Sequence, residues 1–352
     1  MIDFRYHLVS IVAVFLALAI GIVLGSTELQ GPAYNILNST TGKLQNELGQ
    51  VSTQRDAAQQ QAALGQNYAQ VVEPVVLHDL LAGQRLLIIT EPGAPASVVT
   101  AISKAATGYA GATVTGQIAL QSKFFDNSDT TLDGLNQIDL AMSQADNIVL
   151  NTGTPYQQQA AQVIASEILT RAPAATPGQP LTGTSASSQQ DTNAQTMLAA
   201  YANEGFLTIS GQPSAPATLA VIVTPQAAPQ DGTVDPLDQL LVPVAEELAA
   251  KSSATVVAGA SAGSGPGSPI AVLRASSAAS KVSTVDDADF VAGQSVVIQA
   301  LAIQLNGGNP GSYGFANGAS AVGPSPAPTP SASASPSASS TPTTSATKKP
   351  KK

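Results

Sequence analysis

The stretch from Leu8 to Leu24 constrains this chain most. It reads LVSIVAVFLALAIGIVL, with Ser10 as its only polar side chain and no charge. As a helix it is about 25 Å long at ~1.5 Å per residue, and its flanks extend it towards the ~30 Å of a hydrocarbon core. We therefore predict a transmembrane anchor at residues 8–25, a short N-terminus at residues 1–7, and the rest of the chain on one side of a membrane.

A cleaved signal peptide is the alternative interpretation of this stretch. Its apolar region is normally ~7–15 residues long and is followed by a small-x-small cleavage site. Here the run is longer, and the only such pair, Ala17 and Ala19, lies inside it, which favours an uncleaved anchor. Because Arg5 precedes the span and no Lys or Arg follows before Lys43, the positive-inside tendency places the N-terminus in the cytoplasm and the remainder outside.

Small residues recur every four positions along the anchor, at Ala13, Ala17, Gly21 and Gly25. A stripe of this kind lets two helix backbones approach closely, and the last pair has the GxxxG form. The alternative is that Ala and Gly are simply common in membrane helices. The stripe predicts self-association of the anchor.

Residues 31–73 are predicted to form a helical stalk between the pairs Gly31-Pro32 and Glu73-Pro74. The stalk has heptad spacing, and its first half carries apolar residues at the seam. These are Leu37, Leu44, Leu48 and Val51. The spacing predicts a parallel, dimeric coiled coil, so the chain is expected to be a homodimer. A single helix that folds back on the next domain is the alternative.

Short apolar runs alternate with helical patterns over residues 75–322, which favours a Rossmann-like, mostly parallel α/β domain. The predicted strands are Arg85–Thr90, Thr113–Leu120, Asn147–Asn151, Phe206–Ser210, Thr218–Thr224, Thr255–Ala258 and Ile270–Arg274. One predicted helix begins at Pro95–Ser97. The other predicted helices are Tyr156–Arg171, Asp191–Asn203, Pro236–Lys251 and Val291–Leu305. Loops are expected at 172–190 and 259–269.

The C-terminal residues 323–352 consist mainly of Ser, Pro, Ala and Thr and end in a lysine-rich group. Such a composition cannot bury enough apolar surface to fold, so a disordered tail is predicted. Its terminal lysines could bind an anionic wall polymer weakly, and the alternative is an inert, solvated spacer.

Composition limits the partners and the chemistry. The formal net charge is −9, which argues against nucleic acid as a partner. The chain has no cysteine, so disulfides, thiolate metal sites and cysteine nucleophiles are excluded. Aromatic residues make up only 4% of the chain and Trp is absent, so the core must be aliphatic.

Catalytic signatures are missing in the contexts that their chemistry needs. We find no G-x-S-x-G, H-E-x-x-H, P-loop or G-x-G-x-x-G between a predicted strand and a predicted helix, and Gly263–Gly267 is interpreted as a loop. The two histidines are His7, beside the anchor, and His78, which is therefore the one base available to the domain. We predict that the protein is not an enzyme.

Acidic residues provide two candidate sites. Asp286, Asp287 and Asp289 precede the last predicted helix and could hold a hard cation through oxygen ligands. The alternative is helix capping and compensation of the helix dipole. Glu91 follows the first predicted strand at the edge where open α/β sheets bind ligands, so a small-molecule sensor is a further hypothesis.

Copper sites favour Cys, Met or His ligands, and this chain is poor in them. It has two histidines and three methionines, Met1, Met142 and Met197, and His78 could meet one of the methionines.

Three segments carry a resemblance to a known family. They are FRYHLVSIVAVFLALAIGIVLGS, VVLHDLLAGQRLLII and VSTVDDADFVAGQSVVIQALAIQLNGGNPGSYG. Together they resemble the actinobacterial MctB family, also called SteB. The resemblance implies copper homeostasis, through transport or efflux across the cell envelope, and it extends the expected location to an outer membrane. It also implies an alternative: an anchored partner of a division protein that helps to regulate peptidoglycan hydrolysis. It supplies no residue-level copper site.

Overall fold

The structure is a computed structural model that describes residues 4–151, 153–171, 188–214, 216–226 and 236–325. The chain divides into two compact units, Met1–Val71 and Val72–Lys352. Most of the tail predicted at 323–352 lies outside the described residues, as does most of the loop predicted at 172–190.

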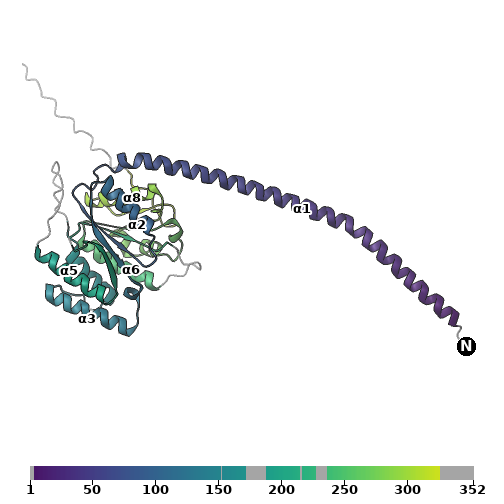
Figure 1. The fold of residues 1–352 in the computed structure, drawn as a ribbon, viewed down its shortest axis with the longest axis horizontal. Helices are drawn as coiled ribbons and strands as arrows, with labels where there is room; N and C mark the ends of the chain where they lie inside the picture. The colour runs from purple at the N-terminus through teal and green to yellow at the C-terminus, as the bar shows by residue number, and fades with distance from the viewer. Residues whose placement is uncertain (1–3, 152, 172–187, 215, 227–235, 326–352) are drawn as a thin grey trace, which may run out of the picture. The chain divides into compact units, whose positions relative to one another are not determined.

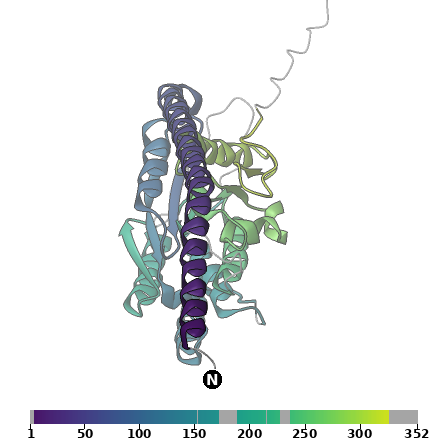
Figure 2. The same ribbon diagram turned by 90° about the vertical axis from the view of Figure 1, so that its right-hand side faces the viewer.

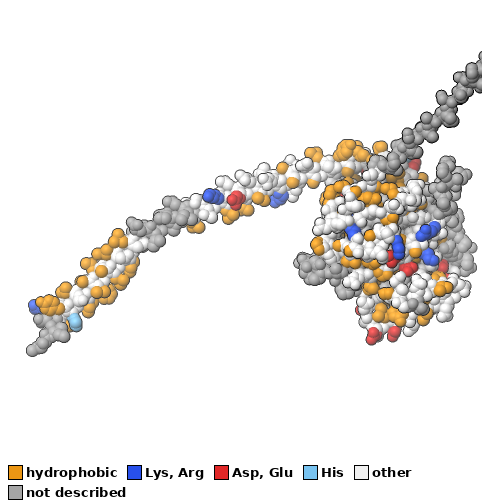
Figure 3. All heavy atoms as spheres, turned by 180° about the vertical axis from the view of Figure 1, so that it is seen from behind, with side chains coloured by type: hydrophobic (Ala, Val, Ile, Leu, Met, Phe, Trp, Pro, Cys, Tyr) orange, Lys and Arg blue, Asp and Glu red, His pale blue; other side chains and the backbone are white. Residues whose placement is uncertain are grey.

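Helix α1 (Phe4–Leu77) supplies nearly all of the first unit. Its segment Phe4–Gly25 is long and apolar enough to cross a membrane, and Figure 3 shows hydrophobic side chains gathered along it. The break predicted at Gly31-Pro32 is wrong, because the helix continues through this pair. Pro in a helix interior costs about 3 kcal/mol, a cost that helix formation on both sides has to offset.

The end predicted for this helix at Glu73-Pro74 is also wrong, because α1 runs on to Leu77. Leu77 is fully buried in the core of the second unit, as is Leu81 in the turn that follows. Burial of Leu77 therefore stabilises the last helical turn beyond the proline. The structure holds one copy of the chain, so the coiled coil stays a prediction.

The second unit is built on a mostly parallel sheet. In the part of the chain that the structure describes, the strand order is β3-β2-β1-β4-β5-β6-β7, with β3 antiparallel to β2 and all other pairs parallel. This is the order of a doubly wound fold with one reversed edge strand. The strands are β1 (Arg85–Thr90), β2 (Thr113–Leu120), β3 (Leu207–Gly211), β4 (Leu219–Val223), β5 (Ala254–Ala258), β6 (Ser283–Val285) and β7 (Ser312–Tyr313).

Helices cover both faces of this sheet (Figures 1 and 2). One face packs against α2 (Ala96–Gly108) and α8 (Val291–Leu305), together with the last turn of α1. The other face packs against α3 (Asp129–Asp146), α4 (Tyr156–Ile168), α5 (Ser188–Asn203), α6 (Pro236–Lys251) and α7 (Pro269–Arg274). Because the central strands are buried on both sides, they are continuous apolar runs rather than alternating ones. The fold class predicted from the sequence is confirmed as mixed α/β with a mostly parallel sheet.

Two predicted strands are wrong. Residues 147–151 form no strand, because Asn147 adopts a left-handed conformation (φ 54°) that ends α3. Residues 270–274 lie in α7 instead. Ser268 caps that helix by accepting a hydrogen bond from the Ala271 N–H at 3.2 Å, and Pro269 occupies the first turn, where proline is tolerated. The strand expected there is β6, further along the chain.

Candidate functional site

His78 lies on the surface at the end of α1. Its side chain is 77% exposed, and Nδ1 lies 3.2 Å from Oδ2 of Asp79. Asp79 has a left-handed backbone (φ 55°) and its N–H donates to the Tyr109 carbonyl, which fixes the turn that presents the imidazole. The arrangement offers one accessible nitrogen ligand beside one carboxylate.

The methionines do not meet His78. Met197 is fully buried on the sheet face covered by α3–α7, and Met142 packs against the same core. Leu77, next to His78, belongs to the core on the opposite face. The sheet therefore separates the thioethers from the imidazole, and the prediction that they come together is wrong. Among the described residues, no three side chains of His, Cys, Asp or Glu are grouped to hold a metal ion.

Asp286 is committed to a buried ion pair. Its Oδ2 lies 2.8 Å from Nη1 of Arg274, and both side chains are almost fully buried. The N–H groups of Phe315 and Ala316 donate to the same carboxylate at 2.7 and 3.1 Å. Arg274 also donates to the Tyr313 carbonyl at 2.7 Å. These contacts hold the segment after β7 against the sheet, which is a structural role for the carboxylate.

Asp289 also has a protein partner. Its two oxygens accept from the N–H and the hydroxyl of Ser261 at 2.8 and 2.7 Å. Ser261 is the central residue of Gly259–Gly263 (GASAG), a G-x-S-x-G sequence directly after β5, within the segment 259–269 that was predicted to be a loop. A nucleophilic serine is activated by an adjacent general base, such as a histidine or a lysine. The Ser261 hydroxyl instead donates to Asp289, while His78 lies beside Asp79, so this segment is a turn and not a catalytic elbow.

Asp287 is the one member of the cluster with free oxygens. Its side chain is buried, and neither oxygen has a hydrogen-bond partner from another described residue. Burial, reinforced by the neighbouring Asp286 carboxylate, raises the pKa of Asp287 to about 6. Gly293, in the first turn of α8, lies against it, because a Cβ at this position would meet the Asp287 backbone and carboxylate. The three aspartates thus have three different environments.

Glu91 is buried just after β1, and its N–H donates to the Val223 carbonyl at the end of β4. It lies at the carboxyl end of β1, as predicted, and there the strand order reverses between β1 and β4. It does not line the polar pocket described next, so the sensor hypothesis receives no support from that cavity.

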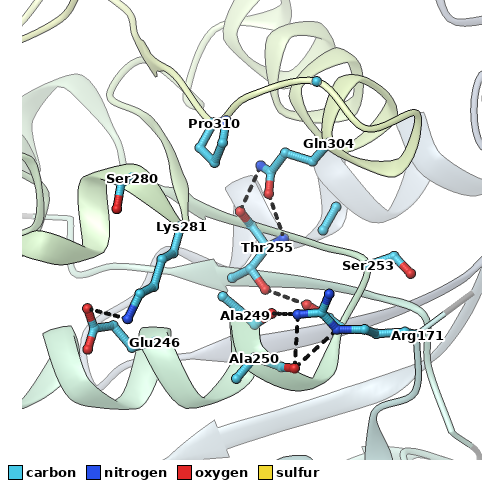
Figure 4. Close-up of a pocket in the computed structure, with 13 residues that line it drawn as sticks. Arg171, Glu246, Ala249, Ala250, Ser253, Thr255, Ser280, Lys281, Gln304 and Pro310 are labelled. Carbon is cyan, nitrogen blue, oxygen red and sulfur yellow. Dashed lines mark hydrogen bonds and ion pairs between the residues drawn. The ribbon is translucent and has the colours of Figure 1, made fainter.

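A polar pocket, which sequence reasoning missed, lies at the amino ends of the strands (Figure 4). Its volume is about 470 Å³, and its walls come from the ends of α6 and α8, the start of β5 and the segments that carry Arg171 and Lys281. Doubly wound folds bind cofactors at the opposite, carboxyl edge, so the fold alone does not indicate this site.

Arg171 enters the pocket from one side. Its Nε and Nη2 donate to the Ala250 carbonyl at 3.2 and 3.1 Å, and Nη2 also reaches the Ala249 carbonyl at 3.4 Å. The preceding residue, Thr170, is fixed by an N–H donated to the Ala217 carbonyl at 2.9 Å. Arg171 therefore caps the C-terminus of α6, where a cation is favoured.

Lys281 enters from the other side, with its Nζ 3.2 Å from Oε1 of Glu246 (Figure 4). Between the two cations lies Gln304 of α8, which accepts from the Thr255 N–H at 3.3 Å and donates to the Thr255 carbonyl at 3.0 Å. The glutamine thus ties α8 to β5 and forms a polar back wall. Because the cations come from segments more than a hundred residues apart, no local motif could have revealed the pocket.

The residues predicted for self-association all lie in α1. Ala13, Ala17, Gly21 and Gly25 are exposed, as are Leu37, Leu44, Leu48 and Val51. A Cβ added at Gly21 or Gly25 would meet nothing within 4 Å. Both sets of residues are therefore accessible to a second helix, and the association itself stays a prediction.

Fold and site together define an α/β protein that carries one apolar N-terminal helix and lacks a grouped metal centre among its described residues. The model of the family described as "Copper transport outer membrane protein, MctB" matches residues 1–324, so the chain belongs to the MctB family.

Similar proteins carry the same name. A copper transporter MctB of Mycobacterium tuberculosis (strain ATCC 25618 / H37Rv) is 32% identical over 327 residues, which cover 92% of this chain and 99% of that protein. A copper transporter MctB of Mycobacterium leprae (strain TN) is 29% identical over 330 residues, with the same coverage. The resemblance inferred from the sequence is thus confirmed.

Proposed function

We propose that this protein serves copper homeostasis in the cell envelope, with copper as its cargo rather than a resident cofactor. Membership of the MctB family supports the proposal, as do relatives named copper transporters that align over 99% of their length. The alternative role in cell separation receives no support from these names. The function is that of a transport protein and not of an enzyme.

We propose that the protein acts as an assembly of several anchored copies. A lipid-spanning path needs several helices or a closed barrel, because backbone polar groups cannot face hydrocarbon unsatisfied. The described part of each chain contributes one candidate span, Phe4–Gly25, which is about 33 Å long at 1.5 Å per residue. The small-residue stripe (Ala13, Ala17, Gly21 and Gly25) and the stalk seam (Leu37, Leu44, Leu48 and Val51) are the proposed contacts between copies. The α/β domain is proposed to be extracytoplasmic.

We propose His78 as the copper contact of the domain. Its Nδ1 faces Asp79, which leaves Nε2 available, and a carboxylate partner of this kind orients an imidazole ligand. One exposed imidazole makes a weak, exchangeable site, which suits a cargo ion better than a resident one. The sequence-based proposal that Asp286, Asp287 and Asp289 hold a hard cation is weaker, because a shared ion would have to displace Arg274 and Ser261.

The test is a Cu(I) titration of the full chain in lipid nanodiscs, under anaerobic competition with a chromogenic chelator. We expect weak, saturable binding that is lost in His78→Ala. The matched control is His7→Ala, which removes the other histidine and should leave the titration unchanged. Binding that persists in His78→Ala would contradict the proposed contact. No binding by the unmodified chain would mean that it affects copper without touching it.

A further inference from the structure

We propose that the pocket between Arg171 and Lys281 binds a small, hydroxylated oxyanion, namely a sugar acid or a sugar phosphate. The proposal does not depend on the copper role. It rests on the charge, the donor geometry and the size of this cavity.

The pocket is locally positive in an acidic protein. The chain has 23 acidic and 14 basic residues. Among the described residues, the cavity is nevertheless lined by two basic side chains, Arg171 and Lys281, and one carboxylate, Glu246. That carboxylate is already engaged, since its Oε1 accepts from the Ser277 hydroxyl at 2.9 Å and lies 3.2 Å from Lys281 Nζ. One cationic charge is therefore left uncompensated among the described lining residues.

The donor geometry suits an anion that accepts from a guanidinium. Arg171 is held by carbonyls through Nε and Nη2, so its planar group is ordered before any ligand arrives. No described residue accepts a hydrogen bond from its Nη1, which leaves two N–H donors for an oxyanion. Ordering of the side chain by the protein lowers the entropic cost of binding. Lys281 adds a second cation on the other side of the pocket (Figure 4).

The size and lining of the pocket suit a polar body. A volume of about 470 Å³ lies within the range of small-molecule sites. Ser253, Ser280, Thr255 and Gln304 bring polar groups to its walls, and several of them already bond within the protein, so they offer mainly acceptor oxygens to a ligand. Among the described lining residues there is no aromatic or long aliphatic side chain. An oxyanion with several hydroxyl groups can therefore exchange its hydration for hydrogen bonds along the walls. A purely apolar ligand would gain little from this lining.

The test is calorimetric titration of the full chain in nanodiscs, in a phosphate-free buffer, with glucuronate, glucose 6-phosphate and glucose as probes. We expect saturable binding of at least one anionic probe and none of glucose. Binding of glucuronate alone identifies a carboxylated ligand, and binding of glucose 6-phosphate alone identifies a phosphorylated one.

Two variants locate the site. Arg171→Gln and Lys281→Glu should each weaken binding by at least about tenfold, because each removes a charge-assisted contact. Lys104→Glu makes the same charge change on α2, outside the pocket, and should bind like the unmodified chain. Arg171 also caps α6, so thermal unfolding of Arg171→Gln is measured in parallel to show whether the variant is still folded. Lys281 does not cap this helix, so Lys281→Glu tests the pocket without disturbing the cap. The proposal fails if neither anion binds, if glucose binds as well as the anions, or if the pocket variants bind as tightly as Lys104→Glu.

Discussion

Asp139 shows how a single buried carboxyl couples this fold to pH. It lies on α3 with no exposed surface, and Oδ1 accepts from the Tyr201 hydroxyl of α5 at 2.6 Å. Its Oδ2 has no partner among the described residues. Burial raises the pKa of Asp139 to about 7, against a lowering by the Tyr201 hydrogen bond. The folded state therefore keeps a proton that the unfolded chain releases near pH 4.

This raised pKa predicts that stability falls as the pH rises. The native state binds the Asp139 proton more tightly than the unfolded chain does, and this stabilises the fold. The stabilisation is complete below the unfolded pKa of the carboxyl and is lost as the pH rises through about 7. Between pH 5 and pH 8 the loss is roughly 2–3 kcal/mol of unfolding free energy. Denaturant unfolding at the two pH values should show this loss in the unmodified chain. Asp139→Asn, which can still accept from Tyr201, should keep only the smaller pH dependence that other buried carboxyls such as Asp287 contribute. The exposed Asp133 of the same helix supplies the control, and Asp133→Asn should retain the full pH dependence.

Gly314 shows why the closing segment of the chain is rich in glycine. It has a φ of +119°, and a Cβ there would meet the Asp286 carboxylate that holds Arg274. Gly314→Ala should lower the unfolding free energy by roughly 3–4 kcal/mol, since it adds both backbone strain and a steric clash. Gly307 has a φ of +81° but open space around it, so Gly307→Ala should cost only about 1–2 kcal/mol. Equal losses in the two variants would show that the clash with Asp286 is unimportant.

At the scale of elements, sequence patterns located most helices and strands, because apolar runs and caps are local signals. The bounds of β1, β2, α6 and α8 agree with prediction. The errors lie where tertiary contacts or a single cap decide. Burial of Leu77 carries α1 past Pro74, and Ser268 turns an apolar run into α7. Helix α3 was not predicted at all, and its inward face contains Asp139 and Ser143 where apolar residues are expected.

The candidate sites were less predictable than the helices and strands, because tertiary contacts rather than local sequence signals decide which side chains meet. Asp286, Asp287 and Asp289 are close together in the sequence, but their side chains lie in different environments. Asp286 pairs with Arg274, Asp289 accepts from Ser261, and the oxygens of Asp287 have no described partner. Arg274 and Asp286 are fixed by tertiary contacts that no spacing rule describes. The segments that carry the family resemblance include this ion pair's carboxylate and the glycines around it, so a large part of their pattern reflects packing.

The seam of α1 gives a prediction that the absence of cysteine makes simple to test. Single cysteines introduced at Leu44 or Leu48 should form disulfide-linked dimers under mild oxidation, because a and d side chains face each other across a parallel coiled coil. Gln45→Cys, one residue beyond Leu44 and off the seam, is the matched control and should crosslink poorly. Non-reducing gels of the membrane-bound chain provide the readout. Equal crosslinking at all three positions would indicate random collision rather than a seam.

At the scale of the whole molecule, several charged side chains of the domain serve to hold its segments together, such as Asp286 with Arg274 and Asp289 with Ser261. The sheet separates Met142 and Met197 from His78, and burial raises the pKa of both Asp139 and Asp287. This arrangement is compatible with the weak, exchangeable copper contact that we propose at His78. Membership of the MctB family and the apolar helix support a location at a membrane of the cell envelope.

The measurement that tests this account most directly is the copper content of cells that lack the protein. Cells without it, grown with added copper, should accumulate more copper than the parent strain, as measured by mass spectrometry of washed cells. A copy of the unmodified gene should restore the parental level, and a His78→Ala copy should restore it only in part. Unchanged copper content in the deletion strain, with normal growth in added copper, would contradict the proposed function.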